Sequence, residues 1–464
     1  MPTTASPPNA LAVSLHDAVS AHAYAKLRGI AEASGSQDIA DALQQLPAEE
    51  RVLVFRVLSR RKAATVFEYM PLGRQTDLVK AMAHEEVQAL LNEMAPDDRT
   101  LFLSELPANA TKQLLTLLTP EERTEAVALL GYPPGTVGRL MTPHYIAVRE
   151  GWTVKEVLDY VREHGQDRET LNVIYVVDDR GELIDDIRIR EFLVRPLEDR
   201  VAELMDRRYV SLSAAAREED AVAVFRREDR TALPVVDTAG VLIGIVTIDD
   251  VLDVAEEAAT RDIQRIGGSE ALDEPYMEIG LVPMIRKRAG WLVILFLSEM
   301  LTATAMGFFE AEIQRAVVLA LFVPLIISSG GNSGSQASTL VIRALALGEV
   351  RLVDWWRVIR REVVAGLALG AILGAIGFMR IAVWSAFTTL YGPHWLLVAV
   401  TVGSALVGIV LWGTIVGSLL PFLLRSLGFD PATSSAPFVA TLVDVTGLVI
   451  YFSVAMVVLR GTLL

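Results

Sequence analysis

The sequence predicts a multidomain membrane protein that combines an all-α superhelical repeat domain, a duplicated α/β module and an α-helical transmembrane domain of five spans. Three observations support this prediction. A motif recurs every 24 residues near the N-terminus, a strand–helix–strand pattern then occurs twice, and the C-terminal part contains long apolar runs. A mean hydropathy of +0.39 beside a charged fraction of 21% also indicates a soluble part joined to a membrane part.

The charge of the chain is unevenly distributed. The formal net charge is −15, and the acidic excess lies before Arg286. The negative electrostatic field of these acids attracts cations and disfavours nucleic acid as a partner. Ordinary solubilising charge explains the acidic excess equally well. The absence of cysteine excludes disulfides and thiolate metal sites. No basic segment followed by an apolar run occurs at the start, so we expect no cleavable signal and a cytosolic N-terminus.

Residues 38–135 contain the repeat, and we expect residues 1–37 to form a flexible N-terminal extension. Each repeat places a turn with proline before acidic residues suited to a helix N-terminus. The anchor residues of the four repeats are Leu46, Met70, Met94 and Leu118. Such units cannot bury their apolar faces alone, so they should stack. Asp97 and Asp98 lie on one of these turns. They are either ion ligands or ordinary acids at the start of a helix.

Residues 136–255 are duplicated, and Asp-x-x-Gly turns join a pair of strands in each copy. The segment resembles a tandem CBS pair, a nucleotide-sensing module. In that family a Gly-Ile-Val-Thr-x-x-Asp pattern contacts an adenine nucleotide, and the second copy carries it at Gly244, Thr247 and Asp250. The first copy lacks the hydroxyl residue. We therefore expect at most one nucleotide site, and a pair that only dimerises and transmits movement is the alternative.

Residues 256–285 continue an acidic connecting helix toward the membrane. Carboxylates spaced along one face of this helix repel each other unless a cation or a basic partner screens them. The carboxylates on this face are Asp250, Asp253 and Glu257. A solvated acidic helix is the alternative, but the position directly before the first span favours a role in gating.

Residues 286–464 should form the transmembrane domain. The apolar runs are long enough to cross a bilayer at about 290–309, 316–347, 363–387, 395–424 and 437–459. Basic residues cluster before the first span and between the second and third. The positive-inside rule then places the N-terminus in the cytosol and the C-terminus outside the cytoplasmic (inner) membrane.

Asp444 lies in the middle of the fifth span. A charge there costs about 2.5–3.5 kcal/mol on insertion scales, so it should face a water-filled path. A small and polar stripe accompanies it on one helical face, and a buried structural hydrogen bond is the alternative. The other residues of this stripe are Ala440, Thr441, Gly447 and Tyr451.

The second span carries Pro324 and three glycines, which we expect to interrupt the helix and free backbone carbonyls beside a cavity. Polar side chains follow along one face of this span, at Asn332, Gln336, Thr339 and Arg343. Mg²⁺ keeps several waters and uses one or two carboxylates, so one aspartate per chain with nearby amides suits it. The same chemistry leaves Mn²⁺ and Co²⁺ open.

The order of these parts resembles the MgtE family of magnesium channels over nearly the whole chain after residue 38. The most specific segments are Gly-Gly-Asn-Ser-Gly-Ser-Gln at 330–336 and Val-Ala-Thr-Leu-Val-Asp-Val-Thr-Gly at 439–447. The resemblance implies a homodimer with a pore at its two-fold axis, where Asp444 binds hydrated Mg²⁺. It also implies cytosolic Mg²⁺ sites that close the channel and ATP at the CBS pair that tunes this response.

The carry-over from the family is uneven. Asp250, Asp253 and Asp262 match connector carboxylates of the family. Ala258 and Arg261 stand where further acids are expected. Feedback by Mg²⁺ should therefore be weaker here or use neighbouring acids. The predicted regulatory set is therefore Asp97, Asp98, Asp250, Asp253, Glu256, Glu257 and Asp262. In the pore loop, Ser335 replaces a common amide. Glu299 is an unexpected acid in the first span that lines the ion path or bonds another helix, and we favour the structural role.

These features predict a Mg²⁺-selective channel for magnesium uptake that cytosolic Mg²⁺ closes. A Co²⁺ or Mn²⁺ transporter on the same scaffold is one alternative, and a non-conducting, membrane-anchored nucleotide sensor is another. We do not expect an enzyme, because the sequence shows no nucleophile–base pair and no histidine metal cluster.

Overall fold

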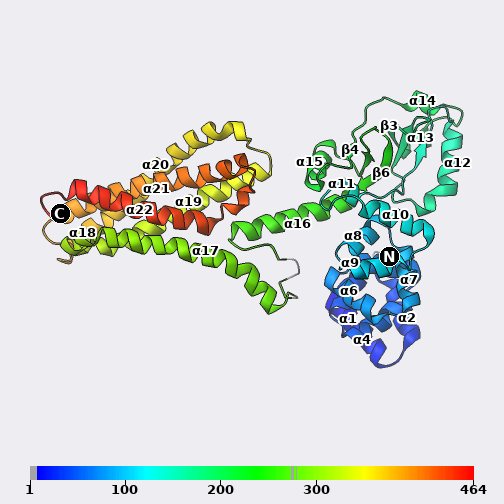
Figure 1. The fold of residues 1–464 in the computed structure, drawn as a ribbon, viewed down its shortest axis with the longest axis horizontal. Helices are drawn as coiled ribbons and strands as arrows, with labels where there is room; N and C mark the ends of the chain where they lie inside the picture. Colours follow the sequence, from blue (N-terminus) through cyan, green and yellow to red (C-terminus); the bar gives the residue numbers. More distant parts are fainter. Residues whose placement is uncertain (1–7, 273–275, 278, 464) are drawn as a thin grey trace. The chain divides into compact units, whose positions relative to one another are not determined.

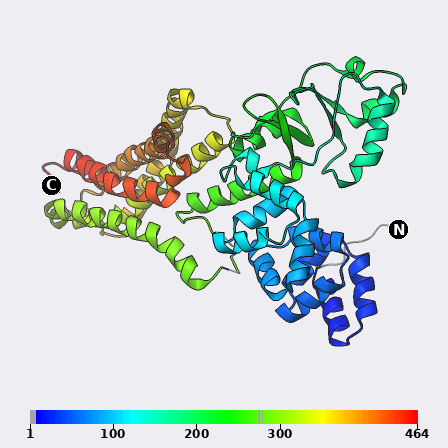
Figure 2. The same ribbon diagram turned by 45° about the vertical axis from the view of Figure 1, so that its right-hand side comes forward.

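The computed structural model describes residues 8–272, 276–277 and 279–463 (Figures 1 and 2). These residues divide into two compact units, and Glu256 ends the first while Glu257 begins the second. Each unit is described by itself.

The first part of the N-terminal unit is a stack of short helices around one apolar core. The helices are α1 (Pro8–Ser20), α2 (Tyr24–Ala33), α3 (Ser36–Gln44), α4 (Ala48–Val57), α5 (Arg60–Glu68), α6 (Leu72–Ala81), α7 (His84–Glu93), α8 (Pro96–Ser104), α9 (Ala108–Leu115) and α10 (Pro120–Leu130). Helices α4, α6, α8 and α10 each begin two residues after a repeat anchor, so the prediction of stacked helical repeats is confirmed.

The expected flexible extension was wrong for the described residues from Pro8 onward, since they form α1 and α2. Leu11 and Leu15 are one helical turn apart on α1, and Leu27 lies on α2. All three are buried in the same core as the repeats. The apolar spacing therefore continues the helical stack toward the N-terminus. Residues 1–7 lie outside the described residues.

One polar side chain in each repeat ties its helix to the preceding one. Arg51, Gln75, Arg99 and Arg123 occur 24 residues apart, and each donates a hydrogen bond to the backbone carbonyl eight residues earlier. These donors satisfy carbonyls at the C-terminal ends of helices, which have no partner within their own helix. The repeat is thus held by a polar contact as well as by its apolar anchors.

The second part of the N-terminal unit contains the two α/β copies. Its elements are α11 (Val137–Leu140), β1 (Ala147–Val148), α12 (Val154–His164), the short 3₁₀ helix Gly165–Asp167, β2 (Val173–Val177), β3 (Leu183–Arg188), α13 (Ile189–Val194), α14 (Val201–Leu204), β4 (Leu212–Ser213), α15 (Glu218–Glu228), β5 (Ala232–Val236) and β6 (Leu242–Thr247). Each copy forms a three-stranded sheet, β1-β2-β3 and β4-β5-β6, in which the first pair is parallel and the second antiparallel.

The predicted turns lie between the antiparallel strands. Gly181 and Gly240 both have φ of +83°, a conformation that glycine adopts without a steric penalty. Asp178 and Asp237 accept backbone N–H groups of the same turns. The duplication seen in the sequence is therefore a duplication of structure.

Helix α16 (Ile248–Ile266) follows β6 directly and ends before the Gly267-Gly268 pair, where Gly268 has φ of +74°. The C-terminal unit then contains α17 (Leu281–Phe308), α18 (Glu310–Arg315), α19 (Val323–Ala346), α20 (Trp355–Ser385), α21 (Trp395–Ser426) and α22 (Ala436–Val458). Short 3₁₀ helices lie at Val317–Phe322, Leu352–Asp354 and Pro431–Thr433. Among the described residues, five helical segments are long and apolar enough to span a membrane, which agrees with the five predicted spans.

The expected interruption of the second span was wrong, because α19 is one continuous helix. Pro324 lies in its first turn, where a missing N–H breaks no hydrogen bond. Gly330 and Gly334 instead face Gly413 and Gly417 of α21. A Cβ added at Gly413 or Gly417 would collide with the backbone carbonyl of Gly330 or Gly334. Small residues at such crossings let two membrane helices approach closely. The glycines thus allow close packing of α19 against α21. Because α19 is continuous, its backbone carbonyls are not freed as predicted.

Candidate ion pathway and regulatory sites

Asp444 lies on α22 where this helix faces α19. An added Cβ at Gly331 of α19 would lie 3.0 Å from Asp444 Oδ1 and 3.2 Å from the Cβ of Ala440. The absence of a side chain at residue 331 therefore leaves room for the carboxylate. Asp444 is half-buried, and Ala440 lies one turn before it on the same side of α22.

The predicted polar face of α19 is exposed in the described C-terminal unit. Asn332, Gln336, Thr339 and Arg343 are all exposed, whereas the opposite face of the helix packs against α21 and α22. Asn332 donates a hydrogen bond only within its own helix, to Ser328 Oγ at 3.3 Å. Amides at membrane depth require water or a polar partner. This face therefore suits either a water-filled path or a second copy of the chain.

The other residues of the predicted small and polar stripe on α22 do not form one surface that could line an ion path. Thr441 is 8% exposed and donates to the Pro437 carbonyl at 3.0 Å. Tyr451 is fully buried and donates to the Leu319 carbonyl at 3.0 Å. Gly447 is buried against α21. Ala440 and Asp444 thus face α19, while the other three positions serve packing within the unit.

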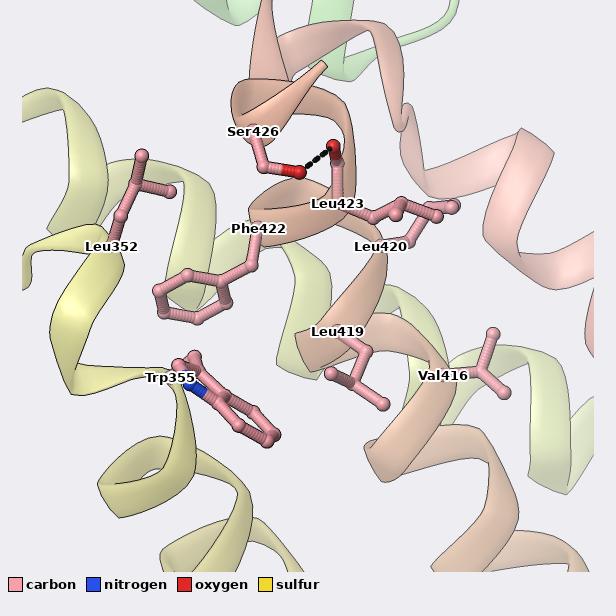
Figure 3. Close-up of a pocket in the computed structure, with 8 residues that line it drawn as sticks. All are labelled: Leu352, Trp355, Val416, Leu419, Leu420, Phe422, Leu423 and Ser426. Carbon is pink, nitrogen blue, oxygen red and sulfur yellow. Dashed lines mark hydrogen bonds between the residues drawn. The ribbon is translucent and has the colours of Figure 1, made fainter.

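A separate cavity of about 500 Å³ lies between the start of α20 and the end of α21 (Figure 3). Leucine, valine, tryptophan and phenylalanine side chains surround it, and Ser426 supplies the one hydroxyl in its lining. That hydroxyl already donates to the Leu423 carbonyl at 2.8 Å. An apolar lining of this kind offers a cation no ligand, so we place no ion site there.

The N-terminal unit brings predicted regulatory acids together. Asp97 and Asp98 of α8 approach Asp250 at the start of α16, and Glu68, Glu169 and Asp249 complete the cluster. Burial, followed by repulsion from neighbouring carboxylates, raises the pKa of Asp98 to about 8 and that of Asp97 well above its usual range. Burial also raises the pKa of Asp250 to about 7. Six acids are thus held where they repel each other.

The cluster fits a hydrated cation. Asp97 is 6% exposed, and its Oδ1 atom is buried with no hydrogen-bond partner. Within the described residues no three acidic or histidine side chains converge closely enough to enclose a bare ion. Mg²⁺ keeps most of its water shell in proteins, so carboxylates held farther apart can bind it through water. Glu68 and Glu169 were not predicted, because no motif marks them and only the fold places them here.

The nucleotide motif of the second copy is engaged in internal contacts. The hydroxyl of Thr247 donates to Asp250 Oδ2 at 2.5 Å, and Asp250 belongs to the acidic cluster. An added Cβ on Gly244 would collide with Met141 and lie 3.0 Å from the Thr142 carbonyl. An acidic and covered environment repels phosphate, so the geometry does not favour the predicted nucleotide site at Gly244, Thr247 and Asp250.

A more suitable cavity lies between the two copies, with a volume of about 430 Å³. It is lined by Asn172, Val173, Arg188, Ile189, Arg190, Asp229, Arg230 and Thr231. Arg188 stands where the family pattern has a hydroxyl, and three arginines (Arg188, Arg190 and Arg230) and one acid (Asp229) are among the lining residues. Arginine is well suited to phosphate. Arg230 also pairs with Asp186 of β3, which fixes one side of the cavity.

Comparisons with known proteins agree with this arrangement. The family model described as "Divalent cation transporter" matches residues 323–454, the "MgtE intracellular N domain" matches 35–135, and the CBS domain matches 137–196 and 201–257. The magnesium transporter MgtE of Thermus thermophilus is 41% identical over 97% of this chain and 99% of its own length.

The chain belongs to the MgtE family.

Other relatives and solved structures support this membership. The magnesium transporter MgtE of Bacillus subtilis is 27% identical and covers 90% of this chain and 93% of its own length. The cytosolic domain of the Mg²⁺ channel MgtE in complex with ATP is 38% identical, with a TM-score of 0.51, over 52% of this chain and 99% of that chain. The soluble part of a magnesium transporter is 25% identical, with a TM-score of 0.52, over 55% of this chain and 100% of that chain.

The remaining predicted regulatory acids of this MgtE family member lie along α16, outside the cluster. Asp253, Glu256 and Glu257 are exposed. Asp262 falls in the C-terminal unit, where Arg265, one turn further along α16, forms an ion pair with Asp430. That contact anchors the end of α16 to the loop before α22 through side chains alone.

The acidic cluster predicts a pH-dependent stability that Mg²⁺ reverses. Carboxyls whose pKa is raised in the folded protein bind more protons than in the unfolded chain, so their stabilising contribution is present below about pH 4 and is lost as the pH rises through about 7 to 8. We expect full-length protein in chelator to melt about 2–4 °C lower at pH 8.5 than at about pH 6. Millimolar Mg²⁺ should restore the lost stability at the higher pH.

The matched variant for this melting experiment is Asp98→Asn. It stays neutral at both pH values, so its melting temperature should change less with pH and rise less with Mg²⁺. Equal pH and Mg²⁺ responses of wild type and Asp98→Asn would contradict this role of the cluster.

Proposed function

We propose that the chain is a homodimeric, Mg²⁺-selective channel of the cytoplasmic membrane. The observation that carries this proposal is the half-buried Asp444 carboxylate, which lies opposite Gly331 and beside a polar face of α19 at membrane depth. A membrane anchor has no use for such a carboxylate. The polar face of α19 is left exposed within one chain, so a second copy related by a two-fold axis would enclose it.

The choice of Mg²⁺ rests on ligand chemistry and on the relatives. A carboxylate flanked by amides can hold the water shell of a strongly hydrated cation without replacing it. Proteins named magnesium transporters match this chain over most of its length. Co²⁺ and Mn²⁺ have similar hydration, so competition among the three ions in a flux assay decides selectivity.

We propose that cytosolic Mg²⁺ closes the channel through the acidic cluster. In its absence the carboxylates of Asp97, Asp98 and Asp250 repel each other across the boundary between the helical stack and α16. Bound Mg²⁺ would offset this repulsion and favour the packed arrangement. A ligand shifts such an equilibrium only by its difference in affinity between the two states. The basic flanks of the spans support a cytosolic N-terminus and an external C-terminus.

Flux measurements test the pore and the feedback together. We expect purified protein in liposomes to conduct Mg²⁺, and Asp444→Asn to reduce this flux by about tenfold or more, because it removes the charge that attracts the cation. Glu349→Gln, in an exposed loop, is the charge-matched control and should conduct like wild type. Millimolar Mg²⁺ on the cytosolic side should lower wild-type flux, and Asp97→Asn with Asp98→Asn should weaken this effect.

Two outcomes of the flux experiment contradict the proposal. Equal flux through wild type and Asp444→Asn would remove Asp444 from the pathway. No divalent flux from wild type under any condition would favour a non-conducting sensor anchored by its spans.

We further propose that ATP binds in the arginine-lined cavity between the two CBS copies rather than at the Thr247 motif. Its volume of about 430 Å³ and its three guanidinium groups suit a nucleotide polyphosphate. A homologous cytosolic domain has been solved in complex with ATP. The acidic surroundings of Asp250 oppose the same ligand at the second copy.

Calorimetric titration of ATP distinguishes the two candidate sites. We expect Arg188→Ala to weaken ATP binding by about tenfold, since a charge-assisted contact to phosphate contributes about 1.5–3 kcal/mol. Thr247→Ala should leave binding within twofold of wild type. The opposite ranking of the two variants would return the nucleotide to the second copy.

A further inference from the structure

Helices α17 and α22 lie side by side and run in the same direction (Figure 1). Near their beginnings, Trp291 Nε1 donates to Ser435 Oγ at 3.0 Å, and its ring lies 6.2 Å from that of Phe438. Near their ends, the rings of Phe309 and Phe452 stack with centroids 4.8 Å apart. These contacts fix the register of the two helices at both ends.

This register places Glu299 of α17 level with Asp444 of α22. At 1.5 Å per residue, Glu299 lies about 12 Å along the helix axis from Trp291, and Asp444 lies about 14 Å from Ser435. The two helices are in direct contact. The C-terminal unit therefore carries a second acid at the depth of the proposed pore aspartate, on a different helix.

Within the described residues, the Glu299 side chain has no hydrogen bond or ion pair, and it is exposed on the surface of the unit. The structural role favoured by sequence reasoning therefore lacks a partner there. One turn further along α17, on the side that packs within the unit, Thr302 is 7% exposed and its hydroxyl is buried without a hydrogen-bond partner. A carboxylate left in hydrocarbon costs about 2.5–3.5 kcal/mol, so the exposed Glu299 carboxylate requires water or a cation.

We propose that Glu299 is a second carboxylate of the ion pathway and acts with Asp444 on the water shell of the same divalent cation. This inference rests on the proposed channel function. Two negative charges favour a divalent over a monovalent cation, because the attraction grows with the charge of the ion. Mg²⁺ sites commonly use one or two carboxylates and leave the remaining positions to water. Glu299 thus determines divalent selectivity, whereas Asp444 is also required for conduction.

The test uses full-length protein in liposomes and compares wild type with Glu299→Gln, Glu299→Asp and the control Glu349→Gln. Cobalt(III) hexaammine, an inert cation of about the size of hydrated Mg²⁺, serves as the blocker. We expect Glu299→Gln to raise the concentration for half-block by about tenfold and to raise Na⁺ flux relative to Mg²⁺ flux. Glu299→Asp keeps the charge and should stay within about threefold of wild type, while Glu349→Gln should be unchanged.

The outcomes separate this inference from the channel proposal. If wild type conducts Mg²⁺ and Glu299→Gln shows the same half-block concentration and the same Na⁺/Mg²⁺ flux ratio, the channel proposal stands and the role of Glu299 is overturned. Equal impairment of Glu299→Gln and Glu299→Asp assigns Glu299 a structural role and overturns the inference as well. No wild-type flux overturns the channel proposal and this inference together.

Discussion

The high energy of an unhydrated charge inside a bilayer is the constraint that organises the membrane unit. Asp444 satisfies it only if water reaches the carboxylate, and the helices around it are arranged accordingly. Gly331 leaves space at the carboxylate, while Gly330 and Gly334 bring α19 close to α21 and α22 on the opposite side. The polar side chains of α19 are thereby left on its exposed face. Close packing on one side of α19 creates the hydrophilic surface on the other.

The acidic cluster of the N-terminal unit follows from the same cost of burying charge, but with a different outcome. Outside the membrane, burial and mutual repulsion make Asp97, Asp98 and Asp250 reluctant to ionise, and a divalent cation relieves that repulsion. In the proposed channel, the Asp444 carboxylate must release its ion quickly, whereas the acidic cluster would hold an ion and so stabilise a packed state. The Arg265–Asp430 ion pair adds a contact at the end of α16 that needs no cation. In the proposed feedback, the acids of the N-terminal unit therefore have the main role.

Much of this architecture was predictable because the relevant signals are local. The five spans, the 24-residue repeat and the two Asp-x-x-Gly turns follow from hydropathy and turn chemistry within short windows. The errors concern contacts between distant residues. The α19 glycines resembled helix breakers until their partners Gly413 and Gly417 were placed opposite. Likewise, only tertiary structure brings Glu68 and Glu169 into the cluster and brings arginines of both CBS copies to one cavity.

Cysteine accessibility along α19 tests the central claim, that its polar face borders a water-filled ion path, most directly. The chain has no cysteine, so a single cysteine at Asn332, Gln336 or Thr339 is the only reactive thiol. A charged, membrane-impermeant thiol reagent should label all three, and Mg²⁺ should slow the reaction. Cysteines at Ile372 and Ile376, exposed apolar positions on α20, should stay unlabelled. Labelling of the α20 positions with none at the three α19 positions would contradict the proposed pathway.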